Sequence, residues 1–124
     1  MSIKVGNVVQ AKVGTVARTN TSAKPLFMLP PNAMVVSVRA LGANSNAGTS
    51  ATITLKSRPV DGSSAAATFA TVNALDTVNG AHAATLTGIA FNRQSTPVHI
   101  TAEYAEAGIA SSAGGAWSLI VEYL

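Results

Sequence analysis

The chain has 124 residues, contains no cysteine, and carries charge on only 10% of its residues. The absence of cysteine excludes a disulfide framework, a thiolate zinc site and thiol catalysis. Ordinary soluble domains carry charge on about 25% of their residues, so this surface is unusually neutral. We therefore expect a partner subunit to cover part of it.

Large apolar side chains are scarce as well. Hydrophobic residues make up 48% of the chain, but 23 residues are alanine, and alanine, serine, threonine and glycine together account for 58 positions. A chain of this length is expected to form one domain over residues 1–124, with a small core. No apolar run approaches the roughly 18–20 residues of a membrane helix. The opening segment also lacks the charged and apolar blocks of a signal peptide. No membrane partner is predicted.

The basic residues form no patch. The net charge is +3, and the isoelectric point of 9.7 reflects a shortage of acids. The basic residues are scattered along the chain as Lys4, Lys12, Arg18, Lys24, Arg39, Lys56, Arg58 and Arg93. Because no basic run could line a phosphate backbone, we expect no nucleic-acid partner.

Apolar and polar residues alternate along several segments, which is the pattern of half-buried strands. The apolar sets are Val5, Val9, Ala11 and Val13; Met34, Val36, Val38 and Ala40; Ile53 and Leu55; Val98, Ile100, Ala102 and Tyr104; and Trp117, Leu119, Val121 and Tyr123. Valine, isoleucine and threonine suit a pleated surface because their branched β-carbons are stiff. Residues 65–75 are rich in alanine, but their threonines and valine favour a strand there too.

Turn residues separate these segments. Pro30-Pro31-Asn32 predicts a tight reversal, because proline fixes φ and asparagine tolerates the left-handed region. Asp61-Gly62 and Asn79-Gly80 are typical of hairpin turns. About eight short strands result, and their spacing predicts an all-β fold. We expect an antiparallel, jelly-roll-like β-sandwich.

The residues that could carry chemistry do not form a recognisable site. We interpret His82 and His99 as solvated or subunit-contact side chains rather than metal ligands. Glu103 lies on a strand face and Glu106 is expected in the following loop, so we interpret them as solvated carboxylates, not a catalytic pair. No nucleophile elbow, phosphate loop or calcium loop is present. We predict no catalytic, metal-binding or cofactor-binding residues, and no enzyme.

Two segments carry a resemblance to a known family. Leu26-Phe27-Met28-Leu29-Pro30-Pro31 leads into the valine-rich Met34–Val38, and Gly114-Gly115 precedes the C-terminal Val121-Glu122-Tyr123-Leu124. Over residues 24–124 the chain resembles the small β-sandwich capsid decoration (cement) proteins of tailed bacteriophages. The resemblance implies a homotrimer on the outside of the virion that contacts the major capsid protein and stabilises the shell. It implies no catalytic residue.

Two further expectations concern contacts. Residues 1–24 form a possible N-terminal arm in which Lys4, Lys12, Arg18 and Lys24 would touch the capsid or a neighbouring subunit; an ordinary first strand followed by a polar loop is the alternative. The rival function is a head-fibre or tail-associated module that binds a receptor or carbohydrate through the loops at 43–50 or 108–116. Neither loop contains the aromatic residues that would favour this rival.

Overall fold

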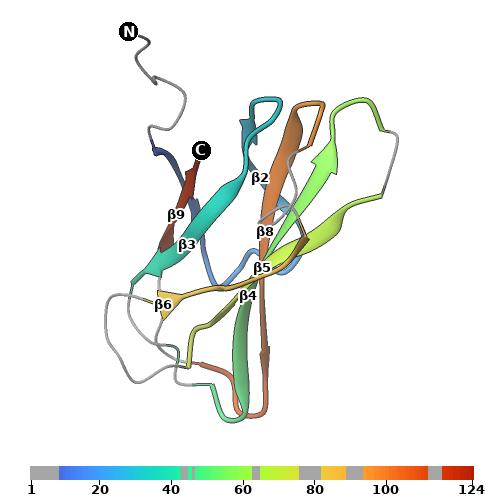
Figure 1. Ribbon diagram of the computed structural model, residues 1–124. Coiled ribbons are helices and arrows are strands. Elements are labelled where there is room, and N and C mark those ends of the chain that lie inside the picture. The colour runs from blue at the N-terminus through green and yellow to red at the C-terminus, as the bar shows by residue number, and fades with distance from the viewer. Residues whose placement is uncertain are drawn as a thin grey trace, which may run out of the picture.

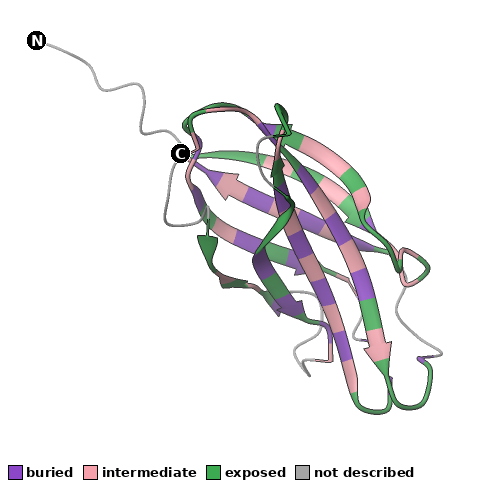
Figure 2. Cartoon of the chain, turned by 90° about the vertical axis from the view of Figure 1, so that its right-hand side faces the viewer, coloured by how far each residue is buried: buried purple, intermediate pink, exposed green. Residues whose placement is uncertain are grey.

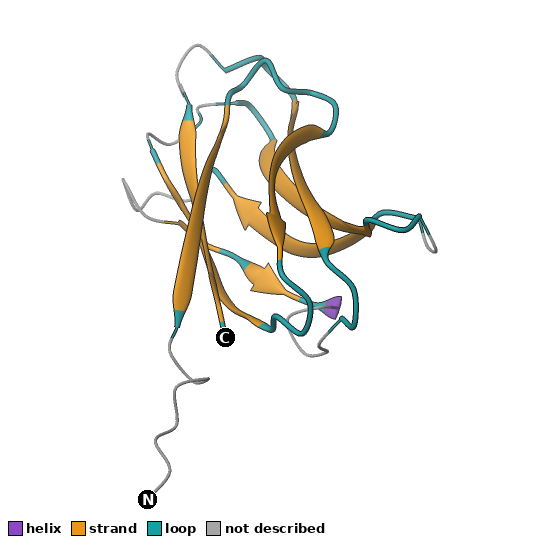
Figure 3. Cartoon of the chain, turned by 90° about the horizontal axis from the view of Figure 1, so that it is seen from above, coloured by secondary structure: helices purple, strands orange, loops and turns teal. Residues whose placement is uncertain are grey.

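The described residues form nine strands. These strands lie in two layers (Figure 1). The computed structural model describes residues 9–42, 45, 47–62, 65–75, 82–88, 94–111 and 116–124. The strands are β1 (Gln10–Val16), β2 (Lys24–Leu29), β3 (Val35–Leu41), β4 (Ser50–Pro59), β5 (Ala67–Asn73), β6 (His82–Ala83), β7 (Thr85–Leu86), β8 (Val98–Ala107) and β9 (Trp117–Tyr123). Figure 3 shows these strands joined by loops and turns. No helix among the described residues could span a membrane.

The strand order confirms the predicted antiparallel sandwich. Sheet A has the order β1-β9-β3-β6, and sheet B has the order β2-β8-β4-β5-β7. Successive strands from β1 to β4 alternate between the sheets, and the last long strands, β8 and β9, pair with the first ones. Eight of the strands interleave in this way as they do in a jelly roll. The remaining strand, β7, adds two residues at the edge of sheet B.

The core lies between the sheets and matches the predicted alternation on the long strands. Every second residue is buried along β9, from Ala51 to Ser57 in β4 and from Val98 to Tyr104 in β8 (Figure 2). Tyr104 of β8 and Trp117 of β9 stack with their ring centroids 5.1 Å apart, which joins the two layers within the core. Residues 67–73 form a strand, as their threonines and valine predicted.

A β-bulge reverses the predicted inner and outer faces at the start of β3. Val35 pairs with Tyr123 and Ser37 pairs with Glu122, so Val36 is an extra residue opposite β9. An extra residue shifts the alternation by one position. Val35 is therefore buried and Val36 is exposed, the reverse of the prediction, whereas Val38 agrees with it.

The structure also reverses the predicted inner and outer faces of β1. The even-numbered residues of β1 pair with the core-facing residues of β9, and the odd-numbered ones pair with its outward residues. Val9 is 48% exposed and Val13 is 62% exposed, while Lys12 and Gly14 lie on the inner side, half-buried. Val5 lies outside the described residues. The part of the possible arm from residue 10 to residue 16 is a strand of sheet A.

The turns follow their chemistry where the structure describes them. Asn32 has φ +63°, so the Pro30-Pro31-Asn32 reversal uses the left-handed region as predicted. This reversal carries the chain from β2 in sheet B to β3 in sheet A. Gly62, with φ +70°, lies in the connection between the paired strands β4 and β5. Asn79-Gly80 lies outside the described residues.

Candidate functional site

The described glutamates are engaged in ion pairs, not gathered into a catalytic centre. The pairs are Arg18–Glu106 at 2.8 Å, Arg39–Glu122 at 3.5 Å and Lys56–Glu103 at 2.9 Å. Glu103 and Glu106 lie three positions apart on an unbroken strand, so they face opposite sides of sheet B. Glu106 belongs to β8 and not to the following loop, which corrects its predicted place. Within the described residues, no three His, Asp or Glu side chains gather as metal ligands.

The two histidines differ. His99 is exposed on the outer face of β8, as predicted. The prediction for His82 is wrong: this side chain is 1% exposed and lies on β6, where it pairs with Ala40 of β3. Neither ring nitrogen of His82 has a hydrogen-bond partner among the described residues. Nothing in the sequence signals this burial, because a two-residue strand is too short to show alternation.

A polar network ties three segments together at one end of the sandwich. Arg18, just after β1, donates from Nε and Nη2 to the two carboxylate oxygens of Glu106, at 2.8 and 3.2 Å. The backbone N–H of Ser111 donates to the same carboxylate at 2.8 Å. These hydrogen bonds, that of Arg18 first, lower the pKa of Glu106 from 4.5 to about 2. The carboxylate is therefore charged and its oxygens are occupied, which suits a structural tie.

Tyr104 closes the same end from inside. Its hydroxyl forms a 2.7 Å hydrogen bond with the Ser45 hydroxyl, and its backbone N–H donates to the carbonyl of Asn20 at 2.7 Å. Burial raises the pKa of the Tyr104 hydroxyl, so this group stays protonated. The network fixes loops and offers no activated nucleophile or base.

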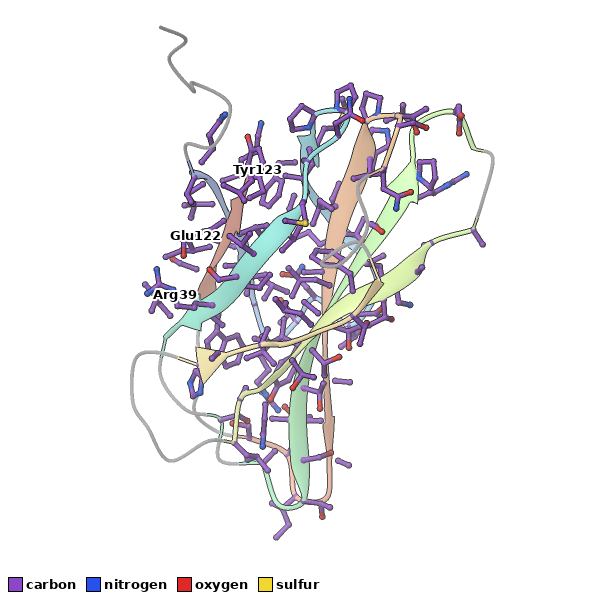
Figure 4. All side chains as sticks on the ribbon, viewed as in Figure 1. Arg39, Glu122 and Tyr123 are labelled. Carbon is purple, nitrogen blue, oxygen red and sulfur yellow. The ribbon has the colours of Figure 1, made fainter. Side chains whose placement is uncertain are left out.

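The exposed apolar side chains on the outer side of sheet A form a different kind of candidate site. We define the sheet A outer face as the outward residues of β1, β9 and β3: Ala11, Val13, Thr15, Ser118, Ile120, Glu122, Ser37, Arg39 and Leu41. Val13 lies beside Ile120, which lies beside Arg39 in the next strand. Figure 4 shows Arg39 and Glu122 on the side away from sheet B. This face combines exposed valine and leucine with a single ion pair, as a surface for another protein would.

The structure describes three of the four predicted contact residues, and each has a different setting. Lys4 lies outside the described residues. Arg18 is held by Glu106, and the Lys24 ammonium donates to the Thr15 carbonyl at 2.8 Å, which links β2 to β1. Lys12 lies at the rim of a hollow between β1 and β2, with Met28 on the other side. Two of these cations thus support the sandwich, and Lys12 borders an open surface.

The fold is similar to chains in two solved phage structures. One, from a structure titled "Capsid of Ralstonia phage GP4", matches with a TM-score of 0.54 and 21% identity, over 100% of this chain and 88% of that chain. The other, from "Cyanophage Pam1 capsid asymmetric unit", matches with a TM-score of 0.57 and 20% identity, over 99% of this chain and 89% of that chain. A scan of protein-family models and a search of curated proteins give no match. At this identity, the likeness shows that the chain shares a sandwich fold with chains from phage capsid structures.

Proposed function

We propose that the chain is a structural protein of a tailed-phage virion, not an enzyme, and that it binds the outside of the assembled capsid. In this proposal it acts as a homo-oligomer, a homotrimer by its resemblance to decoration proteins, and contacts the major capsid protein. The observation that carries the proposal is the match of nearly the whole fold to chains in two phage capsid structures.

The sheet A outer face supports the oligomer. Val13, the most exposed strand residue among the large hydrophobics, lies there with Leu41, and contact with another copy would remove both from water. Arg39 and Glu122 on the same face provide one charge of each sign. A second copy of the chain can satisfy both the apolar and the charged groups of such a face.

Stabilisation of the shell would follow from mass action. A protein that binds the assembled shell, and not its free subunits, stabilises the shell by the free energy of that binding. Small side chains suit such contacts, because alanine, serine and threonine lose little rotamer entropy when they become ordered. No chemical step is needed.

Thermal challenge of purified shells tests this proposal. Shells of the virus that encodes the chain are stripped of it, then heated with and without the purified protein. We expect the protein to sediment with the shells and to raise their melting temperature. Absence of sedimentation with shells at micromolar concentration would contradict the proposal.

The rival function, a receptor- or carbohydrate-binding module on a head fibre or tail, gives the opposite result. It predicts binding to a glycan array without an effect on shell melting. The loops at 43–50 and 108–116 have no aromatic residue to stack on a sugar ring. Among the described residues of these loops, the large apolar side chain that is exposed is Ile109. Decoration of the shell is therefore the function that the molecule supports better.

A further inference from the structure

The edge strand β2 is flanked by two hollows that neither the core nor the polar network explains. The larger, of about 560 Å³, lies over β2, β8 and β4, and Leu26, Phe27 and Met28 form much of its wall. The smaller, of about 350 Å³, lies between β1 and β2 and is bordered by Met28, Tyr123 and three prolines. Met28 lines both hollows and is 45% exposed, so it forms an apolar ridge between them. We call this surface the β2 groove.

The chain itself explains why this groove is open. Residues 24 and 25 pair with β8 in one register and residues 27–29 in another, so Leu26 is an extra residue in β2. A bulge bends the strand that carries it. Beside it, the Lys24 ammonium fixes β2 to the Thr15 carbonyl of β1. The edges of the two sheets therefore touch at Lys24, whereas the smaller hollow separates Lys12 from Met28.

Arg58 and Lys12 supply the positive charge at the groove. Lys56, Arg58 and His99 line the larger hollow, and Lys12 lines the smaller one. No carboxylate is among the described residues that line either hollow. Glu103 neutralises Lys56 from the neighbouring strand. The groove thus combines apolar walls with a basic rim, which complements an acidic and partly apolar partner.

We propose that the β2 groove binds an extended acidic segment of the major capsid protein, with an apolar side chain against Met28 and a carboxylate near Arg58. This inference rests on the proposed function for the identity of the partner. A second copy of the chain fits the groove poorly, because the chain has only five acidic residues and three of them form ion pairs within it.

The chemistry of the groove is tested without any shell. The ¹⁵N-labelled protein is titrated with a short synthetic peptide of alternating glutamate and leucine, and with the lysine–leucine peptide of the same length. We expect amide shifts at Phe27, Met28, Arg58 and His99, and about tenfold weaker binding of the lysine peptide. Equal binding of both peptides, shifts located on the sheet A outer face, or no shift at millimolar peptide would overturn the inference.

Matched variants locate the contact. Arg58→Glu and Met28→Glu each place a negative charge at an exposed position of the groove, and we expect each to weaken binding of the acidic peptide about tenfold. Ile109→Glu makes the same change at an exposed residue beyond the end of β8 opposite to His99, and its affinity should equal that of the wild type. Amide spectra of each variant verify the fold. Equal affinity for Arg58→Glu and Ile109→Glu would contradict the assignment.

A shell experiment separates this inference from the proposed function. Wild type, Arg58→Glu and an Ile109→Glu control at an exposed loop tip are sedimented with stripped shells. If wild type and Ile109→Glu bind and Arg58→Glu binds at least about tenfold less, both proposals are supported. If Arg58→Glu binds as wild type does, the groove is not the shell contact and this inference fails alone. If the wild type does not bind shells, the proposed function fails, and with it the identity of the partner.

Discussion

β9 and its neighbour β1 show the same alternation of apolar and polar residues, but the two strands present it in opposite senses. Trp117, Leu119, Val121 and Tyr123 of β9 face the core, and the residues between them face outward. In β1, paired with β9 along its whole length, Val13 faces outward and Lys12 faces inward. The core accounts for the pattern of β9 and leaves that of β1 unexplained.

This difference teaches where to look for a partner. An apolar face buried in the core stabilises the fold of the single chain, whereas an apolar face on the outside has no such role. Scattered exposed hydrophobic residues are normal, but Val13 adjoins Ile120 and shares its face with Leu41. We therefore expect changes in β9 to affect folding and changes in β1 to affect association.

The largest effect is expected in the core-facing residues of β9. Leu119→Ala removes a fully buried side chain between the small residues Gly14 of β1 and Ala40 of β3, which leaves a cavity. The free energy of unfolding should fall by about 2–5 kcal/mol, measured by urea denaturation. Ser118→Ala, on the outward face of the same strand, is the control and should change stability by less than about 0.5 kcal/mol. Similar losses for both variants would refute the difference between the two faces.

A smaller effect is expected where the chain after β3 passes β9. A Cβ at Gly42 would lie 2.6 Å from Cδ1 of the Trp117 ring, which is fully buried and cannot move away freely. Gly42→Ala should therefore lower the melting temperature, at a cost of about 1–3 kcal/mol. Gly62→Ala is the comparison variant, because nothing lies within 4 Å of the added carbon but Gly62 has φ +70°. Its loss of stability therefore measures backbone strain without a clash. A Gly42→Ala variant as stable as the wild type would show that the packing against Trp117 is looser than described.

The polar tie after β1 should make stability depend on pH. Since the pKa of Glu106 is about 2 in the fold and 4.5 ordinarily, its charge stabilises the fold fully above pH 4.5. This contribution is lost as the pH falls from 4.5 toward 2. Wild type should therefore lose its advantage over Glu106→Gln within this window, as measured by thermal melts at several pH values. A stability difference that stays constant down to pH 2 would contradict the role of the Arg18–Glu106 pair.

The smallest effect on folding is expected at the outward residues of β1. Val13→Thr keeps the branched β-carbon that suits a strand and removes only exposed apolar surface. The free energy of unfolding of the isolated chain should change by less than about 0.5 kcal/mol. A loss comparable to that of Leu119→Ala would place Val13 in the core and remove the contrast between β1 and β9.

Strand periodicity predicted the fold well where strands are long and paired on both sides. In β8 and β9 the alternation identified the buried residues, because one register of each strand faces a single continuous core. In β4 it identified Ile53 and Leu55, but not the buried Ala51 and Ser57. It failed at Val36, since nothing in the sequence signals a one-residue bulge. It also failed for β1, because alternation identifies two faces but does not say which one lies against the core.

The candidate surfaces were harder to predict than the fold. Lys12 was predicted as a contact residue and borders the β2 groove. Arg58, His99 and Met28 also line the groove, but they were not predicted to do so because they come from three strands far apart in sequence. Their proximity depends on the pairing of β2, β8 and β4, which only the topology provides. The burial of His82 depends in the same way on its pairing with β3.

Sedimentation velocity of the purified protein tests most directly whether Val13, the outward valine of β1, serves association. We predict a wild-type species near three times the 12.5 kDa mass of one chain at micromolar concentration, and dissociation to monomers by Val13→Glu with an unchanged strand spectrum by circular dichroism. A wild-type protein that remains a soluble 12.5 kDa monomer under these conditions would contradict the account.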